Sequence, residues 1–463
     1  MHEYSEKLYY KMPIFLQNLA VCFSGYKLSR QRYSGHYQKY LRDLLKNQYS
    51  TSAELKEQQI YLLKNLLRHA FSTVPFYRKW SEDNDASPED FKDLGDLHRL
   101  PIINKEQIRK DPESFCSKEL IRRKNTFIIF TSGTTGKPLK IYCDPDSRRL
   151  HYAFWERFQR WHGVSLGMRR ATFGGRVVIF PNQSKSPFWR YDKFQNNYLF
   201  SSYHMSNNNL KYYYNKLAQT KPDFIDGYPS SIYTLSDYML KKGLPPIKIN
   251  AIFTSAETLF QYQREKIEAA FDSVVADQYG CSEMALFVSQ CEHGTYHAHP
   301  DYGIVEVVDK ENNSVQTGKI GEAVCTSFVN KTMPLIRYRL GDMIRLEERQ
   351  CKCGRAFPVV AEITGRVDDV LHTIDGRPIG RLDPVFKELT SIKETQIIQK
   401  APEHIHLLIV KDSDFTKENQ KQLEYELRKR LGTNMQISFE FTNRIPRDKN
   451  NKFRAVISNV GKQ

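Results

Sequence analysis

The apolar positions near the start of the chain follow helical spacing. Leucine and alanine recur every three or four positions across Leu55–Ala70, which predicts one face of an amphipathic helix. The pattern stops at Val74-Pro75, because a proline disfavours helical geometry in the residue before it. A second break precedes Pro101. We therefore predict that residues 1–121 form the helical beginning of a large domain.

Beyond residue 125, short apolar runs alternate with helical stretches. This alternation favours α/β layering around a largely parallel sheet, so residues 122–300 are predicted to form an α/β core. The predicted strands are 126–130, 177–180, 224–225, 251–254 and 274–276, and the predicted helices are 146–161, 210–219, 231–242 and 260–271.

From residue 302 the pattern becomes mostly that of strands. Residues 301–366 are predicted to form a β-rich subdomain, with a turn at Asn312-Asn313. Residues 367–463 have the size of a small α+β domain. The predicted fold class is α/β, with layered sheets in the large domain. The expected elements here are strands 303–308, 321–327, 343–346, 405–410 and 436–441 and a helix over 416–431.

The composition is that of a globular protein. The chain has 463 residues, of which 40% are hydrophobic. The most apolar early stretch, Ile14–Phe23, is interrupted by polar residues and falls short of the roughly 18 apolar residues that span a bilayer. No small-residue cleavage motif follows it, so we expect no signal peptide, no transmembrane segment and a cytoplasmic location.

The charge balance is basic, with 69 Lys+Arg against 53 Asp+Glu. A surplus of this kind suits a polyanionic small molecule, an anionic membrane face or nucleic acid, and a solvated basic surface explains it equally well. No zinc finger or aromatic RNA-binding signature accompanies the charges, so nucleic acid is not an expected partner.

One loop has the composition of a phosphate-binding site. It follows the predicted strand 126–130 and is rich in hydroxyl groups and glycine. Glycines let backbone N–H groups approach phosphate oxygens closely, and the lysine adds a cation. The spacing is not that of the Walker loop. The candidate phosphate-binding residues are Thr131, Ser132, Gly133, Thr134, Thr135, Gly136 and Lys137.

The sequence Thr-Ser-Gly-Thr-Thr-Gly-Lys-Pro over 131–138 resembles the phosphate loop of the acyl- and aryl-adenylate-forming enzymes. Within that superfamily the chain is similar to phenylacetate–coenzyme A ligases and coenzyme F390 synthetases, and above all to CapK-type proteins associated with capsular polysaccharide synthesis. The similarity extends from about Leu66 to about Lys452. It implies ATP and Mg²⁺ as cofactors, a small carboxylic acid as substrate, and coenzyme A or another molecule as acyl acceptor. The resemblance is compatible with a homodimer and does not decide the oligomeric state.

The segment 277–283 resembles the Tyr-Gly-x-Ser/Thr-Glu box of that superfamily. The resemblance implies that Glu283 helps to hold Mg²⁺ on the phosphates and that Tyr279 lies against the adenine. A carboxylate beside a triphosphate makes physical sense with a metal ion between them. Further nucleotide-binding residues implied by this box and by the segment upstream of it are Gly280, Ser282, Ala256 and Glu257.

The segment 338–342 resembles the Tyr-Arg-Thr-Gly-Asp box, with Leu340 in place of threonine. By resemblance, Asp342 accepts hydrogen bonds from both ribose hydroxyls, a task that suits a fixed carboxylate. An ordinary turn aspartate is the alternative reading, but it leaves Arg337 and Arg339 unexplained.

The last part of the chain carries two further motifs. Residues 365–369 resemble the hinge segment, in which Arg366 contacts the nucleotide and the chain swivels near Asp368. By the same resemblance, residues 367–463 act as a mobile lid that serves two half-reactions. Lys452 matches the catalytic adenylation lysine, although asparagine precedes it where glycine is usual, and Lys449 is the rival.

Two cysteine-containing segments predict a structural zinc site. Cys351 and Cys353 form a close thiol pair, and Cys291 precedes two histidines. Four thiolate and imidazole ligands form a closed tetrahedral zinc site. We choose His297 as the fourth ligand, with His293 as the alternative. The competing interpretation is a set of unliganded thiols near a surface loop.

Three functions are compatible with these motifs. The leading hypothesis is activation of a carboxylic acid to acyl-AMP, with release of pyrophosphate and acyl transfer to coenzyme A. The second is transfer of AMP to a hydroxyl of a cofactor or sugar. The third is a non-catalytic nucleotide-binding partner in polysaccharide assembly. The acid is expected to lie near residues 173–181 and 227–231.

Overall fold

The structure is a computed structural model of the 463-residue chain. It describes residues 8–131, 139–180, 182–257, 259, 261–364, 371–375, 378–379, 385, 391–411, 413–446, 456–458 and 460.

Residues 8–115 are mostly helical. Helix α4 begins with a capping box, in which Thr51 and Glu54 each bond the backbone of the other. It ends at Thr73 with Val74 as its C-cap, and Pro75 opens the next helix, which confirms the predicted break. The elements are α2 (Ile14–Tyr33), α3 (Tyr37–Asn47), α4 (Ser52–Thr73), α5 (Pro75–Asp83), η1 (Pro88–Asp90), η2 (Leu94–Arg99), α6 (Lys105–Lys110) and η3 (Pro112–Phe115).

A 12-stranded sheet crosses the large domain, in the order β11-β12-β13-β14-β10-β9-β8-β7-β6-β3-β5-β4. Strands β5, β3, β6, β7 and β8 are parallel, and the other neighbours are antiparallel. The bounds are β3 (Arg170–Gly174), β4 (Trp189–Asp192), β5 (Asn197–Ser201), β6 (Phe224–Gly227), β7 (Ala251–Ser255), β8 (Val274–Gly280), β9 (Phe287–Gln290), β10 (Tyr296–Ala298), β11 (Gly303–Val308), β12 (Ile320–Ser327), β13 (Tyr338–Glu347) and β14 (Val359–Thr364).

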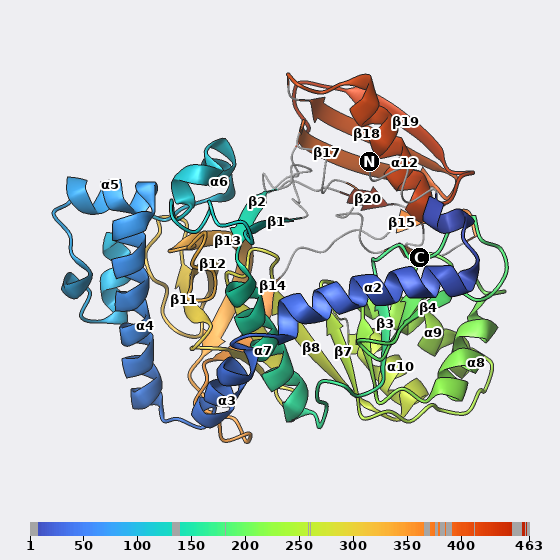
Figure 1. The fold of residues 1–463 in the computed structure, drawn as a ribbon, viewed down its shortest axis with the longest axis horizontal. Helices are drawn as coiled ribbons and strands as arrows, with labels where there is room; N and C mark the ends of the chain where they lie inside the picture. The colour runs from blue at the N-terminus through green and yellow to red at the C-terminus, as the bar shows by residue number, and fades with distance from the viewer. Residues whose placement is uncertain are drawn as a thin grey trace.

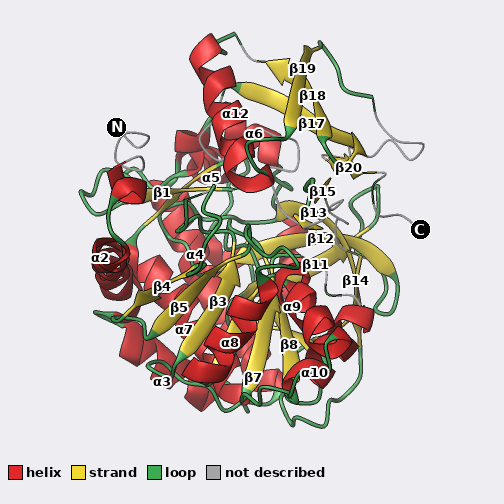
Figure 2. Ribbon diagram, turned by 90° about the vertical axis from the view of Figure 1, so that its right-hand side faces the viewer, coloured by secondary structure: helices red, strands yellow, loops and turns green. Residues whose placement is uncertain are grey.

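Helices cover both faces of the parallel strands (Figure 2). Ile225, Ile252 and Val275 pack with α8 (Leu210–Thr220), α9 (Pro229–Lys241) and α10 (Gln261–Phe271). Their neighbours along the strands, Phe224 and Ala251 among them, pack on the other face with α3 and α7 (Pro145–Trp161). Strands buried on both faces are continuously apolar, which is why these runs were visible in the sequence.

One expectation about strands needs correction. The residues 177–180 do not form a strand: Val178 and Ile179 are buried against Val21 of α2 without joining the sheet. An apolar run can bury its side chains from a loop, so apolarity alone does not imply strand pairing. The β-rich part is also continuous with the parallel core, because β14 pairs with β10. The α/β fold class itself is confirmed.

The C-terminal part forms a separate four-stranded sheet in the order β19-β18-β17-β20, with α12 packed on it. Figure 1 shows it above the large domain. Its core also includes Tyr203 of the large domain, and Arg430 of α12 lies 5.9 Å from that ring. The elements are β15 (Leu371–His372), β16 (Pro378–Ile379), β17 (Ile392–Ala401), β18 (His404–Lys411), α12 (Lys417–Leu431), β19 (Gln436–Phe441) and β20 (Val456–Ser458).

A hairpin of β1 (Phe127–Phe130) and β2 (Lys140–Cys143) leads into α7. Within the described part of the chain, no helix has the length and apolarity needed to cross a bilayer.

Candidate active site

The candidate site lies where parallel strands end. Ala256 and Glu257 directly follow β7, and Tyr279 and Gly280 are the last residues of β8. Because β7 and β8 are parallel neighbours, their carboxyl ends lie side by side. Ligands of open α/β sheets bind at this edge. The sheet therefore brings two of the predicted nucleotide-binding segments to one place.

A hydrogen bond joins two motifs that are far apart in the sequence. The Tyr279 hydroxyl donates to Asp342 Oδ2 at 2.7 Å. Burial raises the pKa of Tyr279, and the negative charge of Asp342 raises it further. The phenol therefore remains a neutral donor that fixes one oxygen of the carboxylate.

Glu283 is held as a carboxylate inside the protein. Tyr338 donates a hydrogen bond to its Oε1 at 3.1 Å, and Lys105 Nζ lies 3.5 Å from the same oxygen. Burial would raise the pKa of Glu283, but the Lys105 ammonium and these hydrogen bonds outweigh it and lower the pKa below its usual value. Glu283 thus carries a negative charge that suits Mg²⁺.

Lys105 is a site residue that the sequence analysis missed. It is the first residue of α6, which Asn104 caps by accepting from the backbone of Glu106 and Gln107. The asparagine and glutamine three positions apart were a readable helix-start signal. Nothing in that signal linked the lysine to Glu283, which is 178 positions away.

Three residues beside the site have left-handed backbone. The φ angles are 75° at Ala256, 57° at Met284 and 49° at Arg337. Non-glycine residues rarely adopt this region, and such strain gathers at functional sites. Arg337 is held there by Glu306, whose Oε1 lies 3.0 Å from its Nη2. This ion pair therefore helps to hold the left-handed backbone directly before Tyr338.

Other predicted residues have identifiable local partners. Glu257 accepts a hydrogen bond from the backbone N–H of Ser230, at the start of α9, at 3.2 Å. Thr131 is buried, and its hydroxyl accepts from the Leu139 N–H at 3.2 Å. This hydrogen bond therefore joins the two ends of the segment that the sequence predicts to bind phosphate. Ser282 and Glu283 lie in the turn that directly follows β8.

Several predicted residues lie outside the described residues. The set comprises Ser132, Gly133, Thr134, Thr135, Gly136, Lys137, Arg366, Asp368, Lys449 and Lys452.

The second predicted cluster is assembled in the structure. Side-chain ligand atoms of Cys291, His297, Cys351 and Cys353 all lie within 4.8 Å of one another. The Sγ atoms of Cys291 and Cys351 are 3.7 Å apart, close to the edge of about 3.8 Å in a tetrahedron with Zn–S bonds of about 2.3 Å. His293 is not among the clustered residues.

The histidine of this cluster is oriented for metal binding. His297 Nδ1 lies 3.0 Å from the Phe357 carbonyl oxygen and donates to it, which leaves Nε2 as the acceptor nitrogen. That Nε2 lies 3.5 Å from Cys353 Sγ. The four residues therefore have the donor types and spacing of a closed structural zinc site.

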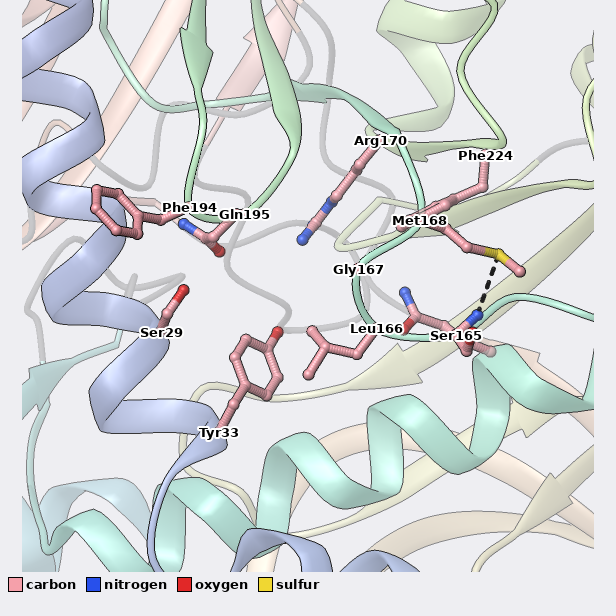
Figure 3. A pocket seen from close by; sticks show the side chains of 11 residues that line it. Ser29, Tyr33, Ser165, Leu166, Gly167, Met168, Arg170, Phe194, Gln195 and Phe224 are labelled. Carbon is pink, nitrogen blue, oxygen red and sulfur yellow. Dashed lines mark hydrogen bonds between the residues drawn. The ribbon is translucent and has the colours of Figure 1, made fainter.

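A separate cavity lies away from this site (Figure 3). It has a volume of about 170 Å³ and is lined by Tyr33 of α2, by the loop before β3 and by Phe194. Arg170, which points into it, is paired with Asp226. Arg170 begins β3, whereas the candidate active site gathers at the opposite ends of the parallel strands. The cavity is therefore distinct from the candidate active site.

Comparison with known proteins identifies relatives of the whole chain. The family model of the CapK C-terminal domain matches residues 371–459. Protein CapK of Staphylococcus aureus is 32% identical over 464 aligned residues, which cover 98% of this chain and 99% of that protein. The chain belongs to the CapK family.

The CapK-family chain is also related to enzymes of defined class. A phenylacetate-coenzyme A ligase of Aromatoleum evansii is 30% identical, with 69% of this chain and 72% of the relative covered. A structure of 2-hydroxyisobutyryl-CoA ligase in the postadenylation state has a TM-score of 0.58 and 20% identity, covering 89% of this chain and 91% of that one. The structure match supports the fold, and the ligase relatives show that the chain is an adenylate-forming acid–coenzyme A ligase by class.

Proposed function

We propose that this chain activates a carboxylic acid with ATP, forming acyl-AMP and pyrophosphate, and then transfers the acyl group to coenzyme A. The observation that carries the proposal is the hydrogen bond between Tyr279 and Asp342, with Glu283 in the turn that follows β8. It joins two boxes that resemble adenylate-forming enzymes into one site, at the edge of the sheet where such sites form.

In this proposal the charged groups have different tasks. Asp342 binds the ribose hydroxyls, and Glu283 holds Mg²⁺, which neutralises charge on the phosphates. Lys105 keeps Glu283 ionised before the nucleotide arrives. Ala256, Glu257, Gly280 and Ser282 line the nucleotide site on the strand ends. The acid lies near residues 173–181 and 227–231.

The first step is displacement at phosphorus, in which a carboxylate oxygen attacks the α-phosphorus and pyrophosphate leaves. Positioning and charge neutralisation dominate such a reaction. Lys452 supplies the ammonium that stabilises the developing charge, and the loop from Thr131 to Lys137 holds the phosphates. Movement near Asp368, with Arg366 on the nucleotide, then exposes the acyl-AMP to the thiol.

We propose a structural role for the second cluster. Zn²⁺ bound by Cys291, His297, Cys351 and Cys353 would join the β9–β10 turn to the loop between β13 and β14. Four protein ligands leave no open position for substrate. A role in capsular or extracellular polysaccharide synthesis is proposed from the sequence resemblance.

The deciding experiment measures pyrophosphate release across a panel of aryl, fatty and amino acids, with and without coenzyme A. We expect release to depend on one class of acid and a thioester to appear only when coenzyme A is present. AMP attached to a hydroxyl compound, with no thioester, would instead establish adenylyl transfer. Binding of ATP without acid-dependent release from any member of the panel would contradict the proposal.

A further inference from the structure

Helix α2 presents its large apolar side chains to solvent. Phe15, Leu19 and Phe23 are 63%, 59% and 59% exposed, and they repeat every four residues along one side of the helix. Ordinarily an amphipathic helix directs such a stripe into the core. Together with the exposed Leu16 and Tyr26, these residues form what we define as the outer stripe: Phe15, Leu16, Leu19, Phe23 and Tyr26.

The inner side of α2 is small and polar, and it is fixed to the edge strand β4. Its buried residues are Gln17, Val21 and Gly25. Arg190 Nε donates to Gln17 Oε1 at 2.8 Å, inside the protein. A Cβ atom at Gly25 would lie 2.2 Å from Asp192 Oδ1. These contacts fix the rotation of the helix about its axis, so the outer stripe cannot turn inward.

A second element extends the apolar surface. Phe194, in the turn between β4 and β5, is exposed, and its ring centroid lies 5.2 Å from that of Tyr26. Figure 3 shows the Phe194 side chain beside α2 and away from Arg170. In Figure 2, α2 is seen end-on at the margin of the molecule. The stripe therefore lies on an outer surface.

The charges carried by α2 and the residues just before it have one sign. Residues 8–33 contain no aspartate or glutamate, and they carry Lys11, Lys27, Arg30 and Arg32. Lys27 Nζ lies 4.3 Å above the Phe23 ring, and Lys11, Lys27 and Arg30 are exposed. A second copy docked on this face would bring like charges together at the apolar contact. An anionic lipid bilayer offers both an apolar interior and negative head groups.

We propose that α2 docks this protein on an anionic membrane surface. The helix lies in the plane of the interface, with Phe15, Leu19 and Phe23 among the upper acyl chains and Lys27 and Arg30 at the head groups. Its 20 residues correspond to a length of about 30 Å. The stripe includes none of the proposed nucleotide-site residues, so the inference is independent of the proposed reaction.

The test is flotation of the full chain with vesicles of phosphatidylcholine alone or with phosphatidylglycerol added. We expect binding to the anionic vesicles that weakens as salt is raised. The variant Phe15→Ser/Leu19→Ser/Phe23→Ser should weaken it at least about tenfold, because the apolar insertion is lost. The variant Lys27→Glu/Arg30→Glu should weaken it at least about twentyfold, because each basic residue near an anionic surface contributes about fivefold.

A matched control replaces three exposed apolar residues elsewhere: Tyr61→Ser/Val274→Ser/Ile320→Ser. This control should bind vesicles as the unmodified chain does, and acid-dependent pyrophosphate release in vesicle-free buffer, if the chain has it, should be equal in all variants. Circular dichroism melting checks folding independently of that activity.

Equal vesicle binding by the stripe variant and the unmodified chain would overturn the proposal. So would equal binding to neutral and anionic vesicles. A dimer in solution that only the stripe variant dissociates, without vesicle binding by the unmodified chain, would assign the surface to self-association instead.

Discussion

The same two stretches of chain build two clusters of opposite chemistry. Residues 279–297 and 338–353 contribute the oxygen donors Tyr279, Glu283 and Asp342 to one cluster, and thiols and an imidazole to the other. Oxygen ligands suit Mg²⁺ and hydroxyl groups, whereas thiolate and imidazole suit zinc. The choice of donor therefore separates a region suited to binding nucleotide from a region suited to bracing the sheet.

The two clusters also differ in how they are held. Left-handed backbone at Ala256, Met284 and Arg337 lies beside the oxygen cluster. The sulfur cluster sits on turns around β9, β10 and the loop before β14, with His297 oriented by a backbone carbonyl. Backbone strain near the oxygen cluster fits a site that must bind and release ligand. A closed set of four donors fits a permanent brace.

The largest effect is expected at the proposed catalytic lysine. Lys452→Ala should lower acid-dependent ATP–pyrophosphate exchange by about a thousandfold or more, because it removes charge stabilisation as pyrophosphate leaves. ATP binding should be retained. Lys449→Ala is the matched control and should keep most of the exchange. The reverse result would assign the role to Lys449.

The sulfur cluster should affect stability rather than chemistry. Cys351→Ser/Cys353→Ser should abolish zinc, measured by metal analysis, and lower the free energy of unfolding by about 4 kcal/mol when metal exceeds its Kd a thousandfold. Exchange activity per folded molecule should change little. Cys22→Ser, at a thiol outside the cluster, is the control. If the double variant kept the melting temperature and metal content of the unmodified chain, the structural role of the sulfur cluster would be rejected.

Asp342 should matter more than its hydrogen-bond partner. Asp342→Ala should raise the KM for ATP and lower kcat/KM about a hundredfold, since both ribose hydroxyls lose a charged acceptor. Tyr279→Phe removes only the donor that orients this carboxylate and should cost about tenfold. Replacing ATP by 2′-deoxy-ATP should lower the activity of the unmodified enzyme more than that of the Asp342→Ala enzyme. If both enzymes lost activity by the same factor, the ribose assignment would fail.

The smallest effect is a shift in pH dependence. Lys105 lowers the pKa of Glu283, so the carboxylate keeps its charge to lower pH than an ordinary buried glutamate. Lys105→Met should raise that pKa, and the acidic limb of the pH–rate profile should move to higher pH. Arg109→Met, on the same helix, should leave the limb in place. A limb that moves to lower pH would contradict the role of Lys105.

Local sequence signals predicted much of the fold. The break at Val74-Pro75 was correct, and β11 has the predicted bounds. Strands β3 and β17 were missed, because polar residues interrupt their apolar patterns. The run 177–180 was wrongly assigned to a strand, since local apolarity does not distinguish burial in a loop from pairing in a sheet.

By itself the sequence determined the donor types, the local helices and strands, and the motifs that resemble adenylate-forming ligases. Only the tertiary structure placed Tyr279 against Asp342 and Lys105 beside Glu283. It also placed His297, the histidine chosen from the sequence, beside the three thiols. It also decided that α2 turns its apolar side outward. These relations join residues far apart in the chain, so they depend on strand order and packing rather than on local spacing.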